Sequence, residues 1–342
     1  MALASKEPVE NGVSPLPPYP VGSPPKTKVR RLKKGSGNGK SAQNGQKQEK
    51  TVLSGAMAVV RDIIVSAGIV VLILVSLFAY TGVWPPMVVI ESNSMMHGND
   101  SQVGVIDTGD LTLVKSIKDR HDVVTYAEAT CSSNPRHGLQ TYGDFGNVII
   151  YRKNGLNEIP VIHRAIAWIE YNASASSPPY RYAGDLPDRG AYNITEYTFT
   201  NVGYQRQNIR INLDSIFRSS AASTSRAPHS GFVTHGDHNP PQVDQESLRI
   251  STGSMVEPVK VGWVVGRSEG ELPWFGLFKL WISGHNPSVF PESSKNGLVI
   301  TVFLLIAVPI SMDLAVSIYK KKKQNDNNKN SNNECPRKNN KK

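Results

Sequence analysis

Three separated segments of this sequence carry the side chains that serine-dependent acyl transfer needs. The first holds Ser94, the second holds His163 within an apolar run, and the third is a turn-rich loop with Asp237 and Asp244. A hydroxyl is a weak nucleophile until a base removes its proton, and an imidazole held by a carboxylate does this at neutral pH. The segments therefore predict a Ser–His–Asp site, and they leave open which Asp faces the imidazole.

The Ser94 segment follows an apolar run long enough to cross a bilayer. Residues 63–84 contain no charge, and a helix of about 22 residues at about 1.5 Å per residue spans the hydrocarbon core. Trp84 and the following pair of prolines favour a helix that ends at the interface. We expect a transmembrane helix over residues 59–84, and a cleaved signal peptide is disfavoured because the preceding region is too long.

A second apolar run, residues 298–319, predicts another transmembrane helix over 297–319, and basic residues flank both runs. Most of the net charge of +10 lies in the two tails, so it indicates topology rather than nucleic-acid binding. We expect a disordered basic tail over 1–58 and a basic tail over 320–342, both cytoplasmic. The intervening domain is then extracytoplasmic, in the cell membrane or the endoplasmic reticulum membrane, where sequons begin at Asn99, Asn172 and Asn193.

Residues 85–296 predict the only globular domain, and its short β-branched runs are separated by Gly, Pro, Asp and Asn. This pattern is typical of a mostly β domain. Polar stretches near 128–147 and 172–230 are interpreted as surface insertions, with the alternative that residues 192–202 and 208–217 add strands or a short helix of their own. The two cysteines, Cys131 and Cys335, fall on opposite sides of the predicted membrane, and the chain has no Cys/His metal spacing. No metal or organic cofactor is expected.

Five short motifs occur in the order of a known family. They are Ser92-Asn-Ser-Met-Met-His97, Thr108-Gly-Asp-Leu111, Ile159-Pro-Val-Ile-His-Arg164, Gly236-Asp-His-Asn239 with Asp244 beyond it, and Val265-Gly-Arg267. Over roughly 60–282, without the two insertions, the chain resembles the type I signal peptidases of the endoplasmic-reticulum and archaeal kind. The resemblance implies a mostly β catalytic domain of that fold, flanked by two transmembrane helices.

The resemblance also implies a role for each matching residue. Ser94 corresponds to the nucleophile, His163 to the general base and Asp244 to the acid, while Asp237 supports the loop or shares the acid role. Ser92 and the Ser94 backbone N–H correspond to the oxyanion donors. The implied function is a membrane-bound serine endopeptidase that removes N-terminal signal peptides from exported preproteins, with membrane lipid and those preproteins as partners.

The chain departs from the family pattern at several places. Asn93 stands where the pattern has Gly, and His97 stands where it has Pro. The spacing from Asp237 to Asp244 is about one residue longer, and the 172–230 insertion has no counterpart. His235 and His238 flank Asp237 without a further metal-ligand set. These differences leave two alternatives open: a catalytically inactive membrane scaffold that binds exported chains or complex partners, and a peptidase with another membrane substrate.

Overall fold

The computed structural model describes residues 42–172, 180–183, 194–224, 227–286 and 290–332. Two units divide at Ser66, with the second running from Ala67 and containing every described strand. The basic cluster before residue 42, Asn193 and Cys335 lie outside the described residues. Asn99 and Asn172 are exposed, and Cys131 is a buried free thiol.

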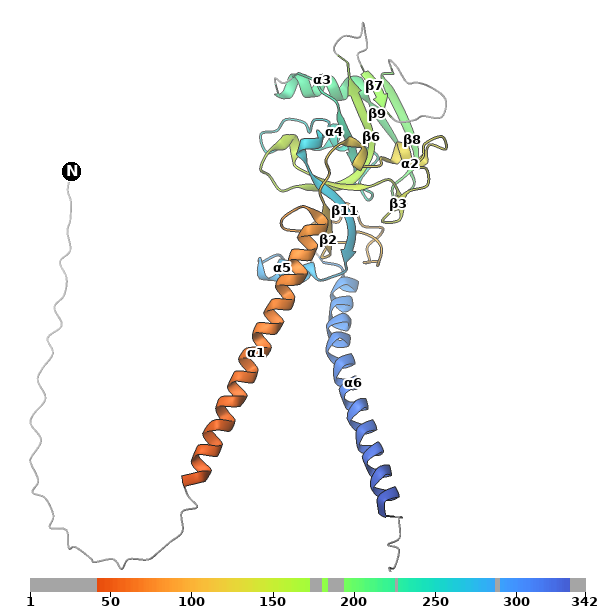
Figure 1. Ribbon diagram of the computed structural model, residues 1–342. Coiled ribbons are helices and arrows are strands. Elements are labelled where there is room, and N and C mark those ends of the chain that lie inside the picture. The colour runs from red at the N-terminus through yellow and green to blue at the C-terminus, as the bar shows by residue number, and fades with distance from the viewer. Residues whose placement is uncertain (1–41, 173–179, 184–193, 225–226, 287–289, 333–342) are drawn as a thin grey trace, which may run out of the picture. The chain divides into compact units, whose positions relative to one another are not determined.

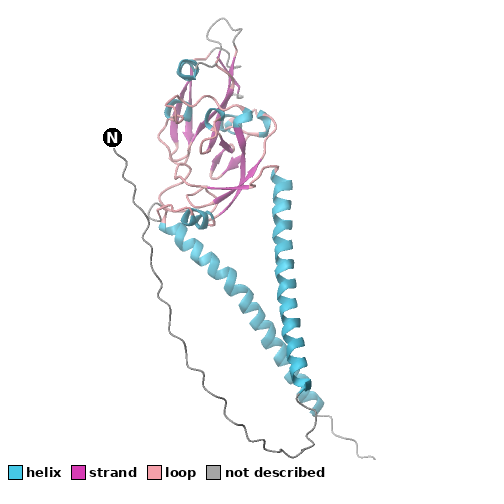
Figure 2. Ribbon diagram, turned by 90° about the vertical axis from the view of Figure 1, so that its left-hand side faces the viewer, coloured by secondary structure: helices cyan, strands magenta, loops and turns pink. Residues whose placement is uncertain are grey.

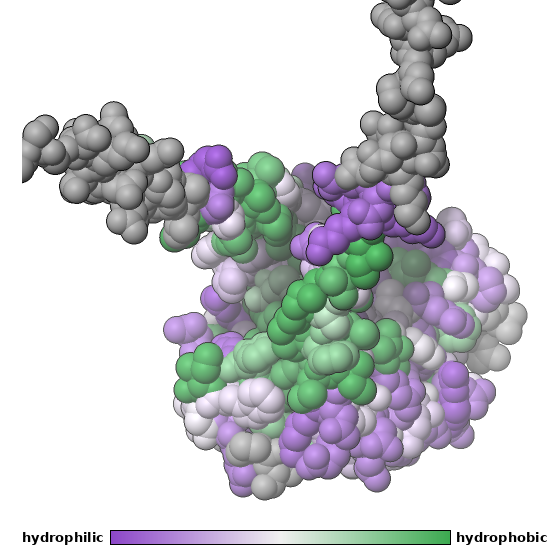
Figure 3. Space-filling view, turned by 90° about the horizontal axis from the view of Figure 1, so that it is seen from below, coloured by the Kyte–Doolittle hydropathy of each residue, from purple (hydrophilic) through white to green (hydrophobic). Residues whose placement is uncertain are grey.

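Two long apolar helices lie near the ends of the described chain, as the sequence predicts in part. Helix α1 spans Ala42–Thr81 and helix α6 spans Glu292–Asn332. Their apolar portions, Val60–Thr81 and Glu292–Asp326, are long and apolar enough to cross a membrane. In the view from below, apolar residues (green) dominate these helices near the domain (Figure 3).

The helix boundaries differ from those predicted. Helix α1 begins at Ala42, so residues 42–58 are helical rather than part of a disordered tail. It stops at Thr81 instead of residue 84, because Gly82 has a left-handed φ of +66° and donates its N–H to Phe78 O at 2.8 Å. Helix α6 continues past residue 319 through the lysine run, since lysine is a good helix former.

One antiparallel sheet forms the framework of the domain (Figure 1, Figure 2). Its main path runs β1-β2-β11-β5-β6-β10, and β7 pairs with the end of β6 on the edge opposite β10. β11, the last of the described strands in sequence, therefore lies inside the sheet between β2 and β5. The strands are β1 Met87–Val89, β2 Leu111–Lys115, β5 Val148–Tyr151, β6 Val161–Tyr171, β7 Tyr180–Ala183, β10 Gly231–His235 and β11 Val264–Leu272.

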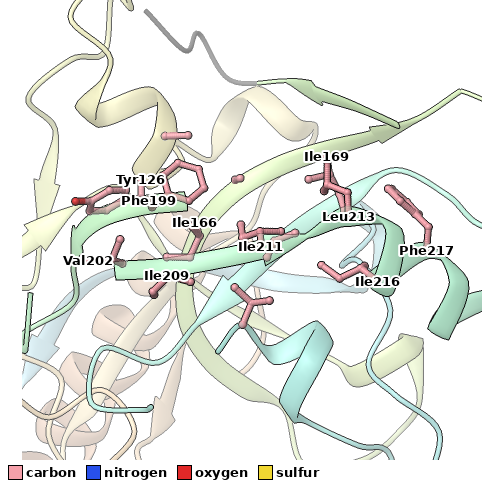
Figure 4. Packing of buried hydrophobic residues seen from close by; sticks show 14 residues of the cluster. Tyr126, Ile166, Ile169, Phe199, Val202, Ile209, Ile211, Leu213, Ile216 and Phe217 are labelled. Carbon is pink, nitrogen blue, oxygen red and sulfur yellow. The ribbon is translucent and has the colours of Figure 1, made fainter. Parts of the chain in front are cut away.

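The 172–230 segment is not only a surface insertion, which corrects the sequence interpretation. Its hairpin of β8 (Glu196–Val202) and β9 (Gln207–Asn212) and its helix α3 (Leu213–Thr224) pack on β6. Ile209 and Ile211 alternate with exposed residues and are fully buried against Ile166 and Ile169 of β6 (Figure 4). Such alternation is the pattern of a strand with one face in the core, so the insertion supplies part of the domain's core.

Short elements complete the domain. The 128–147 segment forms the end of helix α2 (Tyr126–Thr130) and the hairpin of β3 (Gln140–Thr141) and β4 (Asp144–Phe145). Helix α4 covers Asp244–Ser247, and helix α5, Gly276–Ile282, packs through Leu277 and Leu280 against Leu298 of α6. Single 3-10 turns occur at Arg120–Asp122, Lys153–Gly155 and Val261–Trp263. A mostly antiparallel β domain between two apolar helices is thereby confirmed.

Candidate active site

Ser94 lies in a loop that follows β1, and buried neighbours fix this loop. Ile90 donates its N–H to Asp110 O at 2.9 Å, and Met95 and Met96 are 1% and 3% exposed. Their burial leaves Ser94 half-buried, with its Oγ 3.2 Å from Ser92 Oγ. Asn93 is not among the described residues with a positive φ, so the turn does not need the glycine of the family pattern. Residues 92–97 are called the nucleophile loop below.

His163 lies on β6 and contacts Asp244 directly. Its ring is 3% exposed, and its Nδ1 is 2.7 Å from Asp244 Oδ2. The same Oδ2 accepts hydrogen bonds from Tyr151 Oη at 2.7 Å and Thr234 Oγ1 at 2.6 Å. Asp244 is fully buried at the start of α4. Of the two aspartates that the sequence left open, Asp244 is the one that faces the imidazole.

The surroundings of Asp244 favour its charged form. Burial alone would raise the pKa of this carboxyl, but the facing His163 and the hydrogen bonds from His163, Thr234 and Tyr151 outweigh it and lower the pKa. Burial and the nearby Asp244 raise the pKa of Tyr151 well above its ordinary value, which keeps the phenol a donor. A carboxylate at Nδ1 fixes the imidazole tautomer with Nε2 free to take a proton.

The free nitrogen of His163 faces the nucleophile loop. A Cβ placed on Gly236 would lie 2.7 Å from His163 Nε2 and 2.7 Å from the carbonyl oxygen of Ser94. His238 also donates its backbone N–H to that carbonyl oxygen at 2.9 Å. Glycine at this position therefore lets the base and the nucleophile loop approach each other.

The hydroxyl of Ser94 is not bonded to the imidazole in this structure. Among the described residues its hydrogen-bond partner is Ser92 Oγ, at 3.2 Å. Hydrogen bonds of catalytic groups are often long or poorly aligned without substrate and tighten in the complex.

Asp237 forms an ion pair with Arg164 and not with His163. Arg164 donates Nε to Asp237 Oδ1 at 2.8 Å and Nη2 to Oδ2 at 2.6 Å, and both side chains are fully buried. His97 Nε2 lies 3.2 Å from the same Oδ2. Burial would raise the pKa of Asp237, but Arg164 and His97 lower it to about 2. Asp237 thus supports the loop and does not share the contact with His163.

Arg164 extends this support to the 128–147 segment. Its Nη1 donates to carbonyl oxygens of that segment at distances of 3.0 to 3.2 Å, those of Thr141, Asp144, Phe145 and Gly146. Sequence reasoning assigned no role to Arg164, Tyr151 or Thr234. The one sequence feature that could have indicated a role for Arg164 was its position directly after His163, the candidate base.

His235 lies in the Asp237 segment but contacts a backbone carbonyl. His235 is buried, its Nδ1 is 3.0 Å from Gln242 O, and burial lowers its pKa, which favours the neutral ring. Within the described ranges, no group of three or more His, Cys, Asp or Glu side chains could hold a metal ion.

No family model, no curated protein and no solved structure matches this chain. A half-buried serine beside an imidazole whose other nitrogen is held by a buried carboxylate has the composition that acyl transfer requires.

Proposed function

We propose that this chain is a membrane-bound serine endopeptidase that removes N-terminal signal peptides from exported preproteins. The observation that carries the proposal is the buried His163–Asp244 pair, joined at 2.7 Å, whose imidazole faces the loop of Ser94. The five motifs in family order support the same reaction. No metal or cofactor enters it.

Each reacting group has one task in this mechanism. Ser94 Oγ attacks the scissile carbonyl carbon while His163 Nε2 takes the hydroxyl proton, and Asp244 stabilises the imidazolium. Ser92 Oγ and the Ser94 N–H donate hydrogen bonds to the oxyanion. The imidazolium then protonates the leaving amine, which is the new N-terminus of the mature protein. Water activated by His163 hydrolyses the acyl-enzyme and releases the signal peptide with a carboxylate end.

An unpaired strand edge near Ser94 suits an extended substrate. Among the described strands β1 pairs only with β2, so its outer edge is available for strand addition. Next to the nucleophile, buried Ile90 and Met95 pack in one cluster with the partly buried Tyr142 and Ile162. A substrate strand on β1 would run past Ser94, and Tyr142 and Ile162 are the members of this cluster that keep some surface for its side chains. Small residues before the scissile bond are what the family resemblance implies.

The end of α1 is tied to the domain near this edge. Ser116 N donates to Thr81 O at 2.8 Å, and Val114 N donates to Pro86 O at 2.9 Å. The segment from Thr81 to Ser94 is short, and each of its residues can add at most about 3.3 Å to the distance between the end of α1 and Ser94. If α1 and α6 span the bilayer with both tails in the cytoplasm, the site lies on the extracytoplasmic side. A signal peptide still embedded in the membrane is then within reach.

The test is cleavage of a labelled preprotein in liposomes or detergent. The variants are Ser94→Ala, His163→Ala and Asp244→Ala, with Ser215→Ala, an exposed serine on α3, as the matched control. We expect wild type and Ser215→Ala to cut at the signal-peptide junction and the other three to lose cleavage. An inert wild type, or a Ser94→Ala protein that cuts normally, would refute the peptidase and favour the inactive scaffold.

A further inference from the structure

Tyr204 connects two loops of the candidate site by ring stacking. Its ring is 5.5 Å from that of His97 at an interplanar angle of 19°, and 5.7 Å from that of His238 at 5°. His97 ends the nucleophile loop, and His238 belongs to the segment of residues 236–239, here called the Asp237 loop. Tyr204 itself lies in the turn of the β8–β9 hairpin and is 40% exposed.

The hairpin turn is held firmly against the Asp237 loop. Arg206 N donates to Gly203 O at 3.1 Å, which closes the turn, and Gly203 N donates to Asp144 Oδ2 at 2.7 Å. Gly203 has a φ of +70°, and a Cβ there would lie 2.9 Å from Asp237 O. Both the left-handed angle and the close approach require glycine. The ring of Tyr204 is therefore presented from a fixed backbone.

His97 receives contacts from both inserted segments. A Cβ on Gly143, in the β3–β4 turn, would lie 2.8 Å from His97 Cε1, while Tyr204 comes from the 172–230 segment. His97 also stands where the resembled pattern has proline. His97 itself and both inserted segments are departures from that pattern, and all of them meet at the His97 ring. A rigid proline is replaced by an imidazole that other parts of the chain hold in place.

We propose that Tyr204 is a positioning residue that keeps the nucleophile loop and the Asp237 loop in register through His97 and His238. This inference rests on the proposed peptidase function. The two loops already meet where His238 N donates to Ser94 O at 2.9 Å and His238 Nδ1 lies 3.1 Å from Met96 O. Holding His238 therefore holds the backbone of Ser94, and displacement of reacting groups by about 1 Å can cost about 100-fold in rate.

The test compares kcat and KM for preprotein cleavage among Tyr204 variants. Tyr204→Ala loses both stacks, and we expect kcat to fall about tenfold or more with KM changed less than about twofold. Tyr204→Phe keeps the ring and should retain wild-type kcat. Tyr204→Leu keeps side-chain bulk without an aromatic face and should resemble Tyr204→Ala. Thr198→Ala, an exposed position on the same hairpin, is the control and should match wild type.

A second comparison separates positioning from general stability. Thermal unfolding is measured for every variant, and Tyr204→Leu supplies the kinetic comparison if Tyr204→Ala fails to fold. The effect of Tyr204→Ala should also shrink in a His97→Ala background, because one of the two stacks is already absent there. Wild-type kcat in both Tyr204→Ala and Tyr204→Leu would overturn the inference while leaving the peptidase proposal intact. An inert wild type would instead remove the proposed function itself.

Discussion

Asp244→Asn and Asp237→Asn form a matched pair that separates the proposed catalytic carboxylate from a structural one. In Asp244 a single oxygen, Oδ2, accepts all three hydrogen bonds, and Oδ1 has no partner among the described residues. An asparagine can therefore keep its carbonyl oxygen at the Oδ2 position and turn its amide to the empty side. We expect the fold to survive while the negative charge beside His163 is lost.

The expected loss of activity in Asp244→Asn is large. Replacing the acid of a Ser–His–Asp triad by its amide costs about 10⁴ in kcat. Because the asparagine oxygen still accepts from His163 Nδ1 here, we assign the loss to the imidazolium, which no longer has a carboxylate to stabilise it. In free-energy terms this corresponds to about 5.5 kcal/mol of lost transition-state stabilisation. The assay is single-turnover cleavage of a labelled preprotein, with the unfolding midpoint measured on the same sample.

Asp237→Asn should show the opposite behaviour. Both of its oxygens accept hydrogen bonds from Arg164, so an amide must place one NH₂ against a guanidinium donor. Removing one partner of a buried ion pair typically costs about 3–5 kcal/mol, which is a large part of the stability of an ordinary domain. We expect a strongly lowered unfolding midpoint or failure to fold. The reasoning is refuted if Asp237→Asn is stable but inactive while Asp244→Asn remains active.

Three further predictions follow from other contacts. Gly236→Ala should reduce the cleavage rate by about 100-fold or more, because the new Cβ would lie 2.7 Å from both His163 Nε2 and Ser94 O and push them apart. Single-turnover rates check this prediction. Normal rates would contradict it, because they would show that the loop can shift freely. Ser92→Ala should lower kcat by about 100- to 1,000-fold with little change in KM if its hydroxyl, 3.2 Å from Ser94 Oγ, serves the oxyanion; a pure KM effect would contradict this. Burial raises the pKa of Glu271 from 4.5 to about 7. Between pH 4.5 and about 7 the folded state therefore keeps a proton that the unfolded state releases. The free energy of unfolding falls as the pH rises through this range. Glu271→Gln should therefore raise the unfolding midpoint at pH 8 relative to wild type and leave it nearly unchanged at pH 4; an equal shift at both pH values would exclude the titration as the cause.

Much of the composition of the candidate site could be predicted from sequence, because Ser94, His163 and Asp244 lie in short motifs. Ser94 and His163 each occur in a segment whose residue types indicate their roles, and the structure places the two segments side by side. The choice between Asp237 and Asp244 could not be made this way. Both lie in one proline-containing loop, and only the packing of α4 under β10 determines which carboxylate reaches the imidazole.

The inserted segments were the harder part of the fold. Residues 192–202 and 208–217 were open to interpretation as strands or a short helix, but the polar composition of the whole segment suggested a surface location, and nothing local indicated that Ile209 and Ile211 enter the core. Tyr204 has no local signal at all. Its two stacking partners lie far away in the sequence, and such contacts depend on how the hairpin docks rather than on any pattern within it.

The position of β11 has a consequence for biosynthesis. This strand is the last in sequence, and it joins β2 to β5. Until it inserts, the β1–β2 pair that leads to Ser94 is separate from the strands that carry His163 and precede Asp244. Chains are made from the N-terminus, and pairing between distant strands is slow. A chain ending before Val264 thus has Ser94, His163 and Asp244 on an incomplete sheet, and we expect a nascent chain to acquire the proposed activity only once β11 has been made and has paired with β2 and β5.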